Sequence, residues 1–490
     1  MDVSQTCLRG VEGRRGRLPL GLVVFLMGAA WLAASARYAS AQGQTEVVAV
    51  TGDQVANSEE AFVPAFVARF STPVINNHGE VAFVGHSQAG GIGRGGGPVV
   101  SRVYRGRRGR LTRIYEGSVS TNIDLNDAGQ VALLTANTTS PVVIRGDGTT
   151  TVEIARAGQP LPVGTLSSLI GAPNITNDGG VSFVAGGGRR GPGGVYRGAG
   201  SALEVIAQNN QTVPEDGGTF SNFNPGGINL PAPSTNESGQ VAFWAGAITG
   251  GEAYDGIFLG DGISTARIAR DSQTPPFGPN EFRNVDWQQP LVNDAGRVAF
   301  FTDDVNDFPP GGDVYLSDGA TLTRIGGSAT SVLGLNNAGQ VLFAGLAEGN
   351  RPGLLLGTES SLVSIAVQAG TDGANWLEGA SLNEAGQVAF LSNTCGLCLY
   401  DESLGIVEVA QISDPFLEST IVDLGFRGSI GGEPGSLTDT GIPRIAYSFA
   451  LADGRQGIAV WSLVPEPGSF VLVGLAMVGF GIIWHRRRKI

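Results

Sequence analysis

The sequence predicts an all-β fold, a β-propeller with eight blades of about 50 residues each. Three observations predict it. A phrase of the form Asn-x-x-Gly-x-Val-Ala-Phe recurs eight times, strand-like phrases follow each copy, and the one phrase missing at the end of the array stands at its beginning. Glycine, at 76 of 490 residues, is about twice as frequent as usual, which suits many tight turns between short strands.

The recurring phrase, here called the corner, is predicted to be a hairpin turn. Asn, two turn-tolerant residues and Gly fit a type I turn with the Asx side chain first and a left-handed residue last, and the Val-Ala-Phe strand leaves the turn. The last copy, LTDTGIPRI (437–445), is degenerate, and the corner glycines lie about 52 residues apart. The turn residues with an expected structural role are Asn76, Gly79, Asn126, Gly129, Gly179, Asn236, Gly239, Asn293, Gly296, Asn336, Gly339, Asn383 and Gly386.

Two more predicted strands follow each corner. The second strands are short β-branched and aromatic runs such as DGIFLGDG (255–262), and the third are runs such as TARIARDS (265–272). Eight corners and eight second strands are followed by only seven third strands, and TEVVAVTG (45–52) is the missing one. The N-terminal strand is therefore expected to complete the last blade and close the ring. A fourth strand before each corner, as in TPVIN (72–76), completes the blade; seven blades are the alternative.

The first 41 residues predict a secretory signal peptide. Four arginines, beginning at Arg9, precede an apolar stretch, and Ala39 and Ala41 frame a small-residue cleavage site for signal peptidase before Gln42. The general secretory route is expected, because GRRGRL lacks the rest of a twin-arginine motif. A retained N-terminal anchor is the alternative.

The last residues, 464–490, predict a single transmembrane helix. The uncharged stretch runs from Phe470 to Trp484, short for a span that needs about 17 to 25 residues, and Gly468 and Ser469 extend it. The basic residues that follow place this end on the cytoplasmic side. A plain C-terminal anchor would have the same features.

Three elements in order at this end resemble the PEP-CTERM sorting signal: Pro465-Glu466-Pro467, the apolar helix, and Arg486, Arg487 and Arg488. The resemblance implies cleavage by an exosortase near Pro465, with the helix as membrane anchor in transit, and delivery to the cell surface or extracellular matrix of a Gram-negative bacterium. The chain then divides into a signal peptide (1–41), a propeller (42–463) and a sorting signal (464–490). The body is similar to uncharacterised repeat proteins with the same corner phrase, and that similarity implies no activity.

Without its two ends the body is acidic, with a net charge of about −19. Such a body disfavours nucleic acid as a partner. Catalytic signals are sparse: His78 and His86 are the histidines outside the tail, and no Gly-x-Ser-x-Gly elbow occurs. Outside the cell, Cys395 and Cys398 predict a local disulfide, with free thiols or a redox pair as alternatives.

The acidic residues are interpreted as structural where they repeat, since they occur in successive corners: Asp127, Asp178, Glu237, Asp294, Glu384 and Asp439. One acidic cluster does not repeat and is a weak calcium candidate, although it lacks EF-hand spacing: Asp303, Asp304, Asp307 and Asp313. No cofactor is otherwise expected. Local basic spots that could touch acidic polysaccharide are Arg107, Arg108, Arg110, Arg189 and Arg190.

The sequence therefore favours an exported protein with a non-enzymatic binding, adhesive or structural role, with a glycan or surface protein as ligand. A secreted propeller enzyme acting on polysaccharide, a lyase or glycosidase, is the alternative. A non-repeating cluster of acidic, Tyr, Arg or His side chains at the mouth of the central channel would favour the enzyme.

Overall fold

The computed structural model describes residues 42–55, 60–63, 71–89, 99–136, 140–161, 164–166, 168–186, 193–215, 217–223, 233–274, 282, 284–285, 290–303, 312–347, 349–367, 379–392, 395–428 and 435–464. Within them the chain forms strands and turns without a helix, and Gly43–Leu463 make one compact unit. No helix in this part of the chain could span a membrane. The predicted signal peptide, transmembrane helix and sorting signal, with Asp304, Asp307, Arg189 and Arg190, lie outside the described residues.

The first half of the unit contains four antiparallel sheets in chain order. Their strands are β2 (Glu60–Phe62), β3 (Val74–Ile75), β4 (Val81–Ala89), β5 (Val100–Arg107) and β6 (Arg110–Glu116); β7 (Val119–Leu125), β8 (Val131–Thr135), β9 (Val142–Gly146) and β10 (Thr151–Arg156); β11 (Ser168–Ile175), β12 (Val181–Gly186), β13 (Gly194–Gly198) and β14 (Leu203–Gln208); and β15 (Thr219–Asn222), β16 (Ser234–Thr235), β17 (Val241–Thr249), β18 (Glu252–Gly260) and β19 (Thr265–Arg270).

The second half continues the pattern, and the long strand β24 joins two repeats into one sheet. Its strands are β20 (Asn284–Val285), β21 (Leu291–Val292), β22 (Val298–Asp303), β23 (Gly312–Ser317), β24 (Leu322–Leu335), β25 (Val341–Ala347), β26 (Arg351–Gly357) and β27 (Leu362–Val367); β28 (Ala380–Leu382), β29 (Val388–Ser392), β30 (Gly396–Asp401) and β31 (Gly405–Ala410); and β32 (Pro415–Phe416), β33 (Ser419–Gly425), β34 (Arg444–Leu451) and β35 (Gln456–Val464), which pair with β1 (Gln42–Val50).

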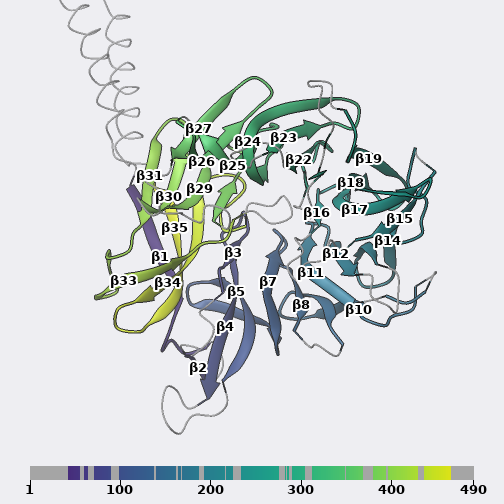
Figure 1. Ribbon diagram of the computed structural model, residues 1–490. Helices are drawn as coiled ribbons and strands as arrows, with labels where there is room; N and C mark the ends of the chain where they lie inside the picture. The colour runs from purple at the N-terminus through teal and green to yellow at the C-terminus, as the bar shows by residue number, and fades with distance from the viewer. Residues whose placement is uncertain are drawn as a thin grey trace, which may run out of the picture. The chain divides into compact units, whose positions relative to one another are not determined.

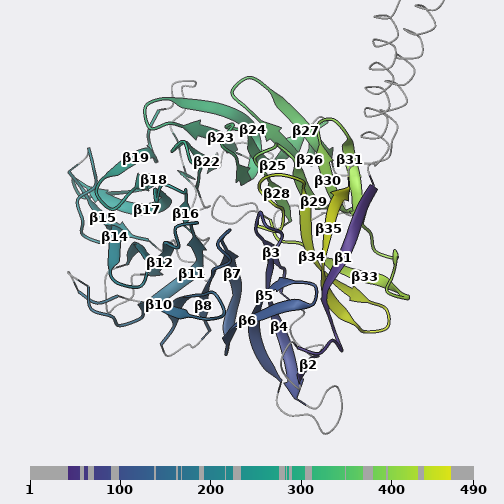
Figure 2. The same ribbon diagram turned by 180° about the vertical axis from the view of Figure 1, so that it is seen from behind.

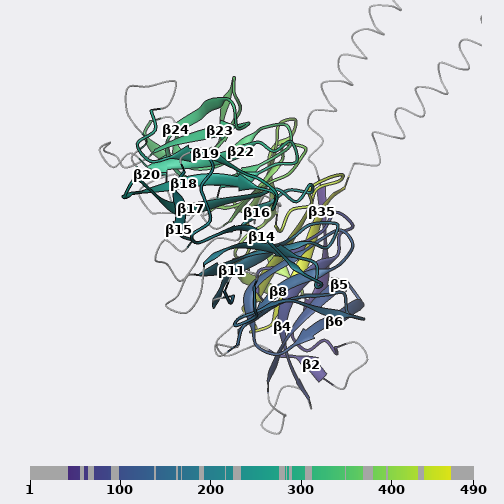
Figure 3. The same ribbon diagram turned by 90° about the vertical axis from the view of Figure 1, so that its right-hand side faces the viewer.

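Within Gly43–Leu463 the sheets follow one another around a centre (Figure 1), and Figure 3 shows successive repeats stacked from the side. This arrangement confirms the predicted all-β propeller. The described strands form seven sheets, one of which contains two repeats, so the count of eight blades stays a prediction.

The N-terminal strand occupies the place of the missing third strand, as predicted. β1 lies beside β35, so the last sheet has the order β1-β35-β34-β33-β32 (Figure 2). The Thr51 N–H donates to the Gln456 carbonyl at 2.8 Å, and the Gln456 N–H donates to Thr51 Oγ1 at 3.1 Å. Main-chain hydrogen bonds therefore join the two ends of the propeller, and β1 covers the edge of β35 that would otherwise be unpaired.

The hydrophobic core lies between successive sheets. In one cluster Val143 and Ile154 of one repeat pack with Phe183 and Tyr196 of the next, and the two rings stack with centroids 5.8 Å apart. Each sheet is covered on both faces. For this reason even Ser182 of β12, the strand that leaves its corner, is fully buried. This explains why these strands are near-continuous small and apolar runs.

Seven of the eight corners are hydrogen-bonded type I turns ended by a left-handed glycine, and the degenerate corner at 438–441 is a bend without this hydrogen bond. Taking Asn126 as an example, the Gly129 N–H donates to the Asn126 carbonyl at 3.0 Å, and the Asn126 N–H donates to the Gln130 carbonyl at 3.1 Å. All eight corner glycines have φ between 74° and 84°, which favours Gly over any residue with a Cβ.

The corner asparagine also fastens its repeat to the next one. Asn126 Oδ1 accepts the Gln130 N–H at 2.8 Å inside its own turn, while Asn126 Nδ2 donates to the Thr176 carbonyl of the next corner at 3.0 Å. The same amide-to-carbonyl bond, 2.9 to 3.3 Å long, is made by Asn76, Asn236, Asn293, Asn336 and Asn383. Asn is needed because an amide supplies both an acceptor and a donor.

We expect Asn336→Asp to destabilise the protein by about 2 kcal/mol, because a buried carboxylate would face the Asn383 carbonyl without a donor hydrogen. Asn336→Thr is the matched control, since Thr176 and Thr438 occupy this position in two natural repeats. Chemical denaturation measures both variants. Equal costs for Asp and Thr would show that a carboxylate facing the Asn383 carbonyl carries no penalty of its own.

Candidate functional site at the central cavity

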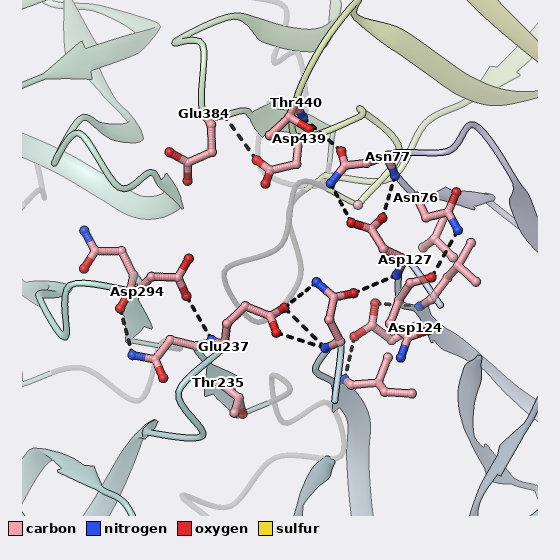
Figure 4. Close-up of a pocket in the computed structure, with 18 of the residues that line it drawn as sticks. Asn76, Asn77, Asp124, Asp127, Thr235, Glu237, Asp294, Glu384, Asp439 and Thr440 are labelled. Atoms are coloured by element: carbon pink, nitrogen blue, oxygen red, sulfur yellow. Dashed lines mark hydrogen bonds between the residues drawn. The ribbon is translucent and has the colours of Figure 1, made fainter. Parts of the chain in front are cut away.

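The corners place a second set of polar side chains around the centre of the propeller. In seven repeats the residue after the corner Asn or Thr accepts the backbone N–H of its counterpart in the preceding repeat (Figure 4). These N–H···O distances run from 2.8 Å, for Asn77 to Asp127, to 3.2 Å, for Glu384 to Asp439. The eight residues, here called the corner ring, are Asn77, Asp127, Asn177, Glu237, Asp294, Asn337, Glu384 and Asp439.

The corner ring is continuous. The last repeat returns to the first through Thr440, whose N–H donates to Asn77 Oδ1 at 2.9 Å. Amide and carboxylate also pair across neighbouring repeats: Asn77 Nδ2 donates to Asp127 Oδ2 at 3.0 Å, and Asn337 Nδ2 donates to Asp294 Oδ2 at 2.9 Å. The ring therefore fixes the direction of each side chain while oxygen atoms remain toward the centre.

The corner ring lines a cavity of about 280 Å³. Its described walls consist of acidic, amide, threonine, aliphatic and glycine residues, and they contain no Ser, His, Cys, Tyr or Arg. This composition offers hydrogen-bond acceptors and donors together with negative charge. The described lining does not offer a Ser or Cys nucleophile beside a His base.

The environment of the ring raises the pKa of several carboxyl groups. Burial, followed by repulsion from Glu384, raises the pKa of Asp439 to about 7. Burial also raises the pKa of Glu237 and of Glu384, and the charge of Asp294 adds to both. Part of the negative charge is therefore neutralised by protons near neutral pH.

We expect Asp439→Asn to stabilise the protein at pH 8 by about 1 kcal/mol, and not at pH 4. A carboxyl group with a raised pKa favours the folded state below its unfolded pKa near 4, and this contribution is lost as pH rises toward 7. Thermal unfolding between pH 4 and pH 8 measures the difference, with the exposed Glu402→Gln as control. A stability difference between Asp439→Asn and the unchanged protein that is the same at pH 4 and pH 8 would contradict the raised pKa of Asp439.

One acidic residue of the cavity does not belong to the repeat. Asp124 lies in β7, is 4% exposed, and accepts the Ile175 N–H at 2.9 Å and Asn174 Nδ2 at 3.0 Å. Burial raises its pKa, although Arg427 opposes the shift, and burial lowers the pKa of Arg427 to about 10. The sequence analysis did not single out Asp124. The feature that could have indicated it is an acidic residue in the otherwise uncharged strand before a corner.

Comparison with known families shows what the chain is related to. A model described as a family of unknown function, DUF7453, matches residues 106–397. The chain belongs to the DUF7453 family. The PEP-CTERM protein-sorting motif matches residues 463–488 and confirms the predicted signal. This motif identifies the DUF7453 protein as exported and processed by an exosortase in a Gram-negative bacterium.

Solved structures match the chain at low similarity. The β-propeller domain of the trilobed protease from Pyrococcus furiosus has 12% identity and a TM-score of 0.40, over 82% of the DUF7453 chain and 97% of its own. The acylaminoacyl peptidase of Pyrococcus horikoshii has 12% identity and a TM-score of 0.41, over 82% and 53%. The sialidase of Trypanosoma rangeli has 10% identity and a TM-score of 0.29, over 87% and 60%. The chain thus spans little more than half of the last two. Curated proteins give no match.

The structure gathers most of the repeated acids of DUF7453 that the sequence indicated, but not all. Asp127, Glu237, Asp294, Glu384 and Asp439 line the cavity. Asp178, one position further along its corner, instead pairs with Arg197 at 2.8 Å. The structural interpretation of these acids is incomplete, because the same corners that build the fold also present their side chains to the cavity.

His78 and His86 of the DUF7453 chain lie outside the cavity lining. The His78 side chain is 64% exposed, with Nδ1 4.0 Å from Asp127 Oδ1. His86 Nδ1 lies 3.0 Å from Ser101 Oγ, and burial lowers the pKa of His86. No carboxylate bond to the His86 ring is found among the described residues, so a Ser-His pair is present there without a third member.

The remaining candidate residues of DUF7453 have local partners. Cys395 and Cys398 are joined by a disulfide. The Asp313 carboxylate accepts two hydrogen bonds from Arg324, at 2.7 and 2.8 Å, which neutralises a member of the calcium candidate. Over the described part of the chain, no group of three His, Cys, Asp or Glu residues could hold a metal ion.

Proposed function

We propose that this DUF7453 protein is a non-enzymatic binding protein of the cell surface or extracellular matrix, and that the corner ring binds a neutral, hydroxyl-rich glycan. The observation that carries the proposal is the continuous ring of three amides and five carboxylic acids around one cavity. Sugar hydroxyl groups donate to carboxylates, and amides both donate and accept. The side chains are already held in place by neighbouring N–H groups, which lowers the entropic cost of binding.

The charge of the site selects among glycans. Five acidic residues, in a body with a net charge of about −19, repel uronates and sulfated sugars. A neutral glycan avoids that repulsion and still uses the charged acceptors, whose hydrogen bonds are the stronger ones. Neutral oligosaccharides are therefore the ligand class that the cavity fits best.

A glycan array followed by calorimetry tests the proposal on the exported protein. Glu237→Gln keeps an oxygen for the Asn177 N–H, which bonds Glu237 Oε2 at 3.0 Å, and removes the charge. We expect it to weaken binding of a neutral glycan about tenfold. Glu402→Gln, an equal charge change at an exposed turn, should leave the affinity unchanged. Selective binding of acidic glycans, or equal affinities of the two variants, would refute the assignment.

Glycoside hydrolysis is the second candidate, and one observation favours it. Burial raises the pKa of Asp439 to about 7, and its carboxyl group accepts the Glu384 N–H at 3.2 Å; a carboxylic acid that keeps its proton near neutral pH beside a second carboxyl group is what general acid catalysis requires. In this case the exported protein would release reducing ends from a neutral glycan, and Asp439→Asn would abolish the release. Binding without release of reducing ends supports the non-enzymatic role.

A further inference from the structure

A second cavity, of about 680 Å³, lies at the seam where β1 closes the ring. Three parts of the chain that are distant in sequence form it. Its lining comprises Thr45, Val47, Val48 and Val50 of β1, Asp53, Gln54, Phe62, Arg108, Gly109 and Leu111 near the first repeat, and Phe416, Leu417 and Arg455 of the last repeat. The volume is within the range of about 300 to 1,000 Å³ typical of small-molecule sites.

Seven of the thirteen lining residues of this seam cavity are apolar. Val48 of β1 shares a hydrophobic cluster with Leu111, whereas Val47 and Val50 pack against the cluster that Phe416 and Leu417 also cover. Leu417 has φ 50°, an unfavourable conformation for a side chain with a Cβ, and the guanidinium of Arg455 holds its carbonyl. The Phe416 ring is fixed edge-on against Phe449, with centroids 5.0 Å apart. The apolar tip of the β32–β33 hairpin is thus held in place at the cavity.

The charged side chains that line the seam cavity are two guanidinium groups, Arg108 and Arg455, and one carboxylate, Asp53. Arg455 pairs with Asp453 at 2.7 Å, and Asp53 Oδ2 accepts the Val50 N–H at 3.1 Å. Arg108 is exposed at the tip of the β5–β6 hairpin and has no ion pair within the described residues.

We propose that the seam cavity binds a small anionic ligand with an apolar body, a carboxylate or sulfate on a hydrocarbon or aromatic skeleton. The anionic group lies at Arg108, whose guanidinium can donate two hydrogen bonds to it. The skeleton lies between β1 and the Phe416–Leu417 tip and removes apolar surface from water. Because β1 supplies four lining residues, the site exists only in the closed ring. This proposal is independent of the glycan site in the central cavity.

Calorimetry with octanoate and with octanol tests the proposal on the exported protein, since the two probes share a skeleton and differ in charge. We expect octanoate to bind more tightly than octanol. Arg108→Gln should weaken octanoate binding about fivefold to thirtyfold and change octanol binding less than about twofold. Arg107→Gln is the matched control, because Arg107 carries the same charge in the same hairpin but does not line the cavity.

A second variant separates the apolar contribution from the charge. Leu111→Asn should weaken binding of both probes while the midpoint of thermal unfolding shows that the fold persists. The proposal is overturned if octanoate does not bind, if Arg107→Gln and Arg108→Gln have equal effects, or if galacturonate, an anion without an apolar skeleton, binds as tightly as octanoate.

Discussion

Deletion of residues 42–51 is expected to destabilise the propeller by on the order of 5 kcal/mol, the largest effect that we predict for any change in this chain. The deletion removes Val48 and Ala49, which are 5% and 0% exposed in a core cluster shared by the first and last repeats. It also leaves β35 as an open edge. Thermal unfolding and the onset of aggregation measure the effect.

A permuted chain provides the control for this deletion. Thr51 pairs with Gln456, and the Gly43 backbone lies against Trp461, so β1 runs antiparallel to β35. Residues 43–52 placed after Val464 through an Asn-Gly turn would form a hairpin in the same position. This permuted chain should regain most of the lost stability. Failure to regain it would mean that the strand acts through something other than closure of the last sheet.

The second large effect concerns a buried charge in the first repeat. The Arg102 side chain is 5% exposed, donates to Glu60 Oε1 at 2.9 Å and to Glu116 Oε2 at 3.1 Å, and contacts Glu60 through a further ion pair of 2.5 Å. Ser87 Oγ, fully buried, also donates to Glu60 at 2.8 Å. The cluster joins β2 to β4, β5 and β6.

Arg102→Leu is expected to destabilise the protein by about 3 kcal/mol, because Glu60 would lose its countercharge in a poorly solvated position. The double variant Glu60→Leu with Arg102→Leu should cost much less, since removal of both charges leaves no unpaired carboxylate. Denaturant unfolding of the two single variants and the double variant gives the coupling energy. Additive costs would show that the ion pair has no energetic role.

Much of the fold is predictable from the sequence because it rests on local geometry. The turn at Asn126 and Gly129 depends on hydrogen bonds that span at most four residues, so eight similar phrases predict eight similar corners. The closing strand is predictable for a different reason. Eight second strands are followed by only seven third strands, so the count shows that the last repeat lacks one. β1 supplies that strand as the neighbour of β35.

The candidate sites were less accessible to sequence reasoning. The acids of the corner ring are recognisable as turn residues, but each bonds to a residue of another repeat, as Asn77 does to Asp127, 50 positions away. Asp124 and the Arg102 cluster have no repeated pattern that would have indicated them. The basic spot at Arg108 was noted, but the apolar residues of the same cavity come from both β1 and the Phe416–Leu417 tip of the last repeat.

The sequence by itself determined the repeat, the geometry of the corner, the strand that closes the ring and the export of the protein through its sorting signal. Only the tertiary structure decided that the corner side chains meet around one cavity and that β1 forms a second cavity with the first and last repeats. The physical reason is the range of the interactions involved. Turn conformation is fixed by neighbouring residues, whereas a cavity is formed by side chains that approach one another only after the ring has closed.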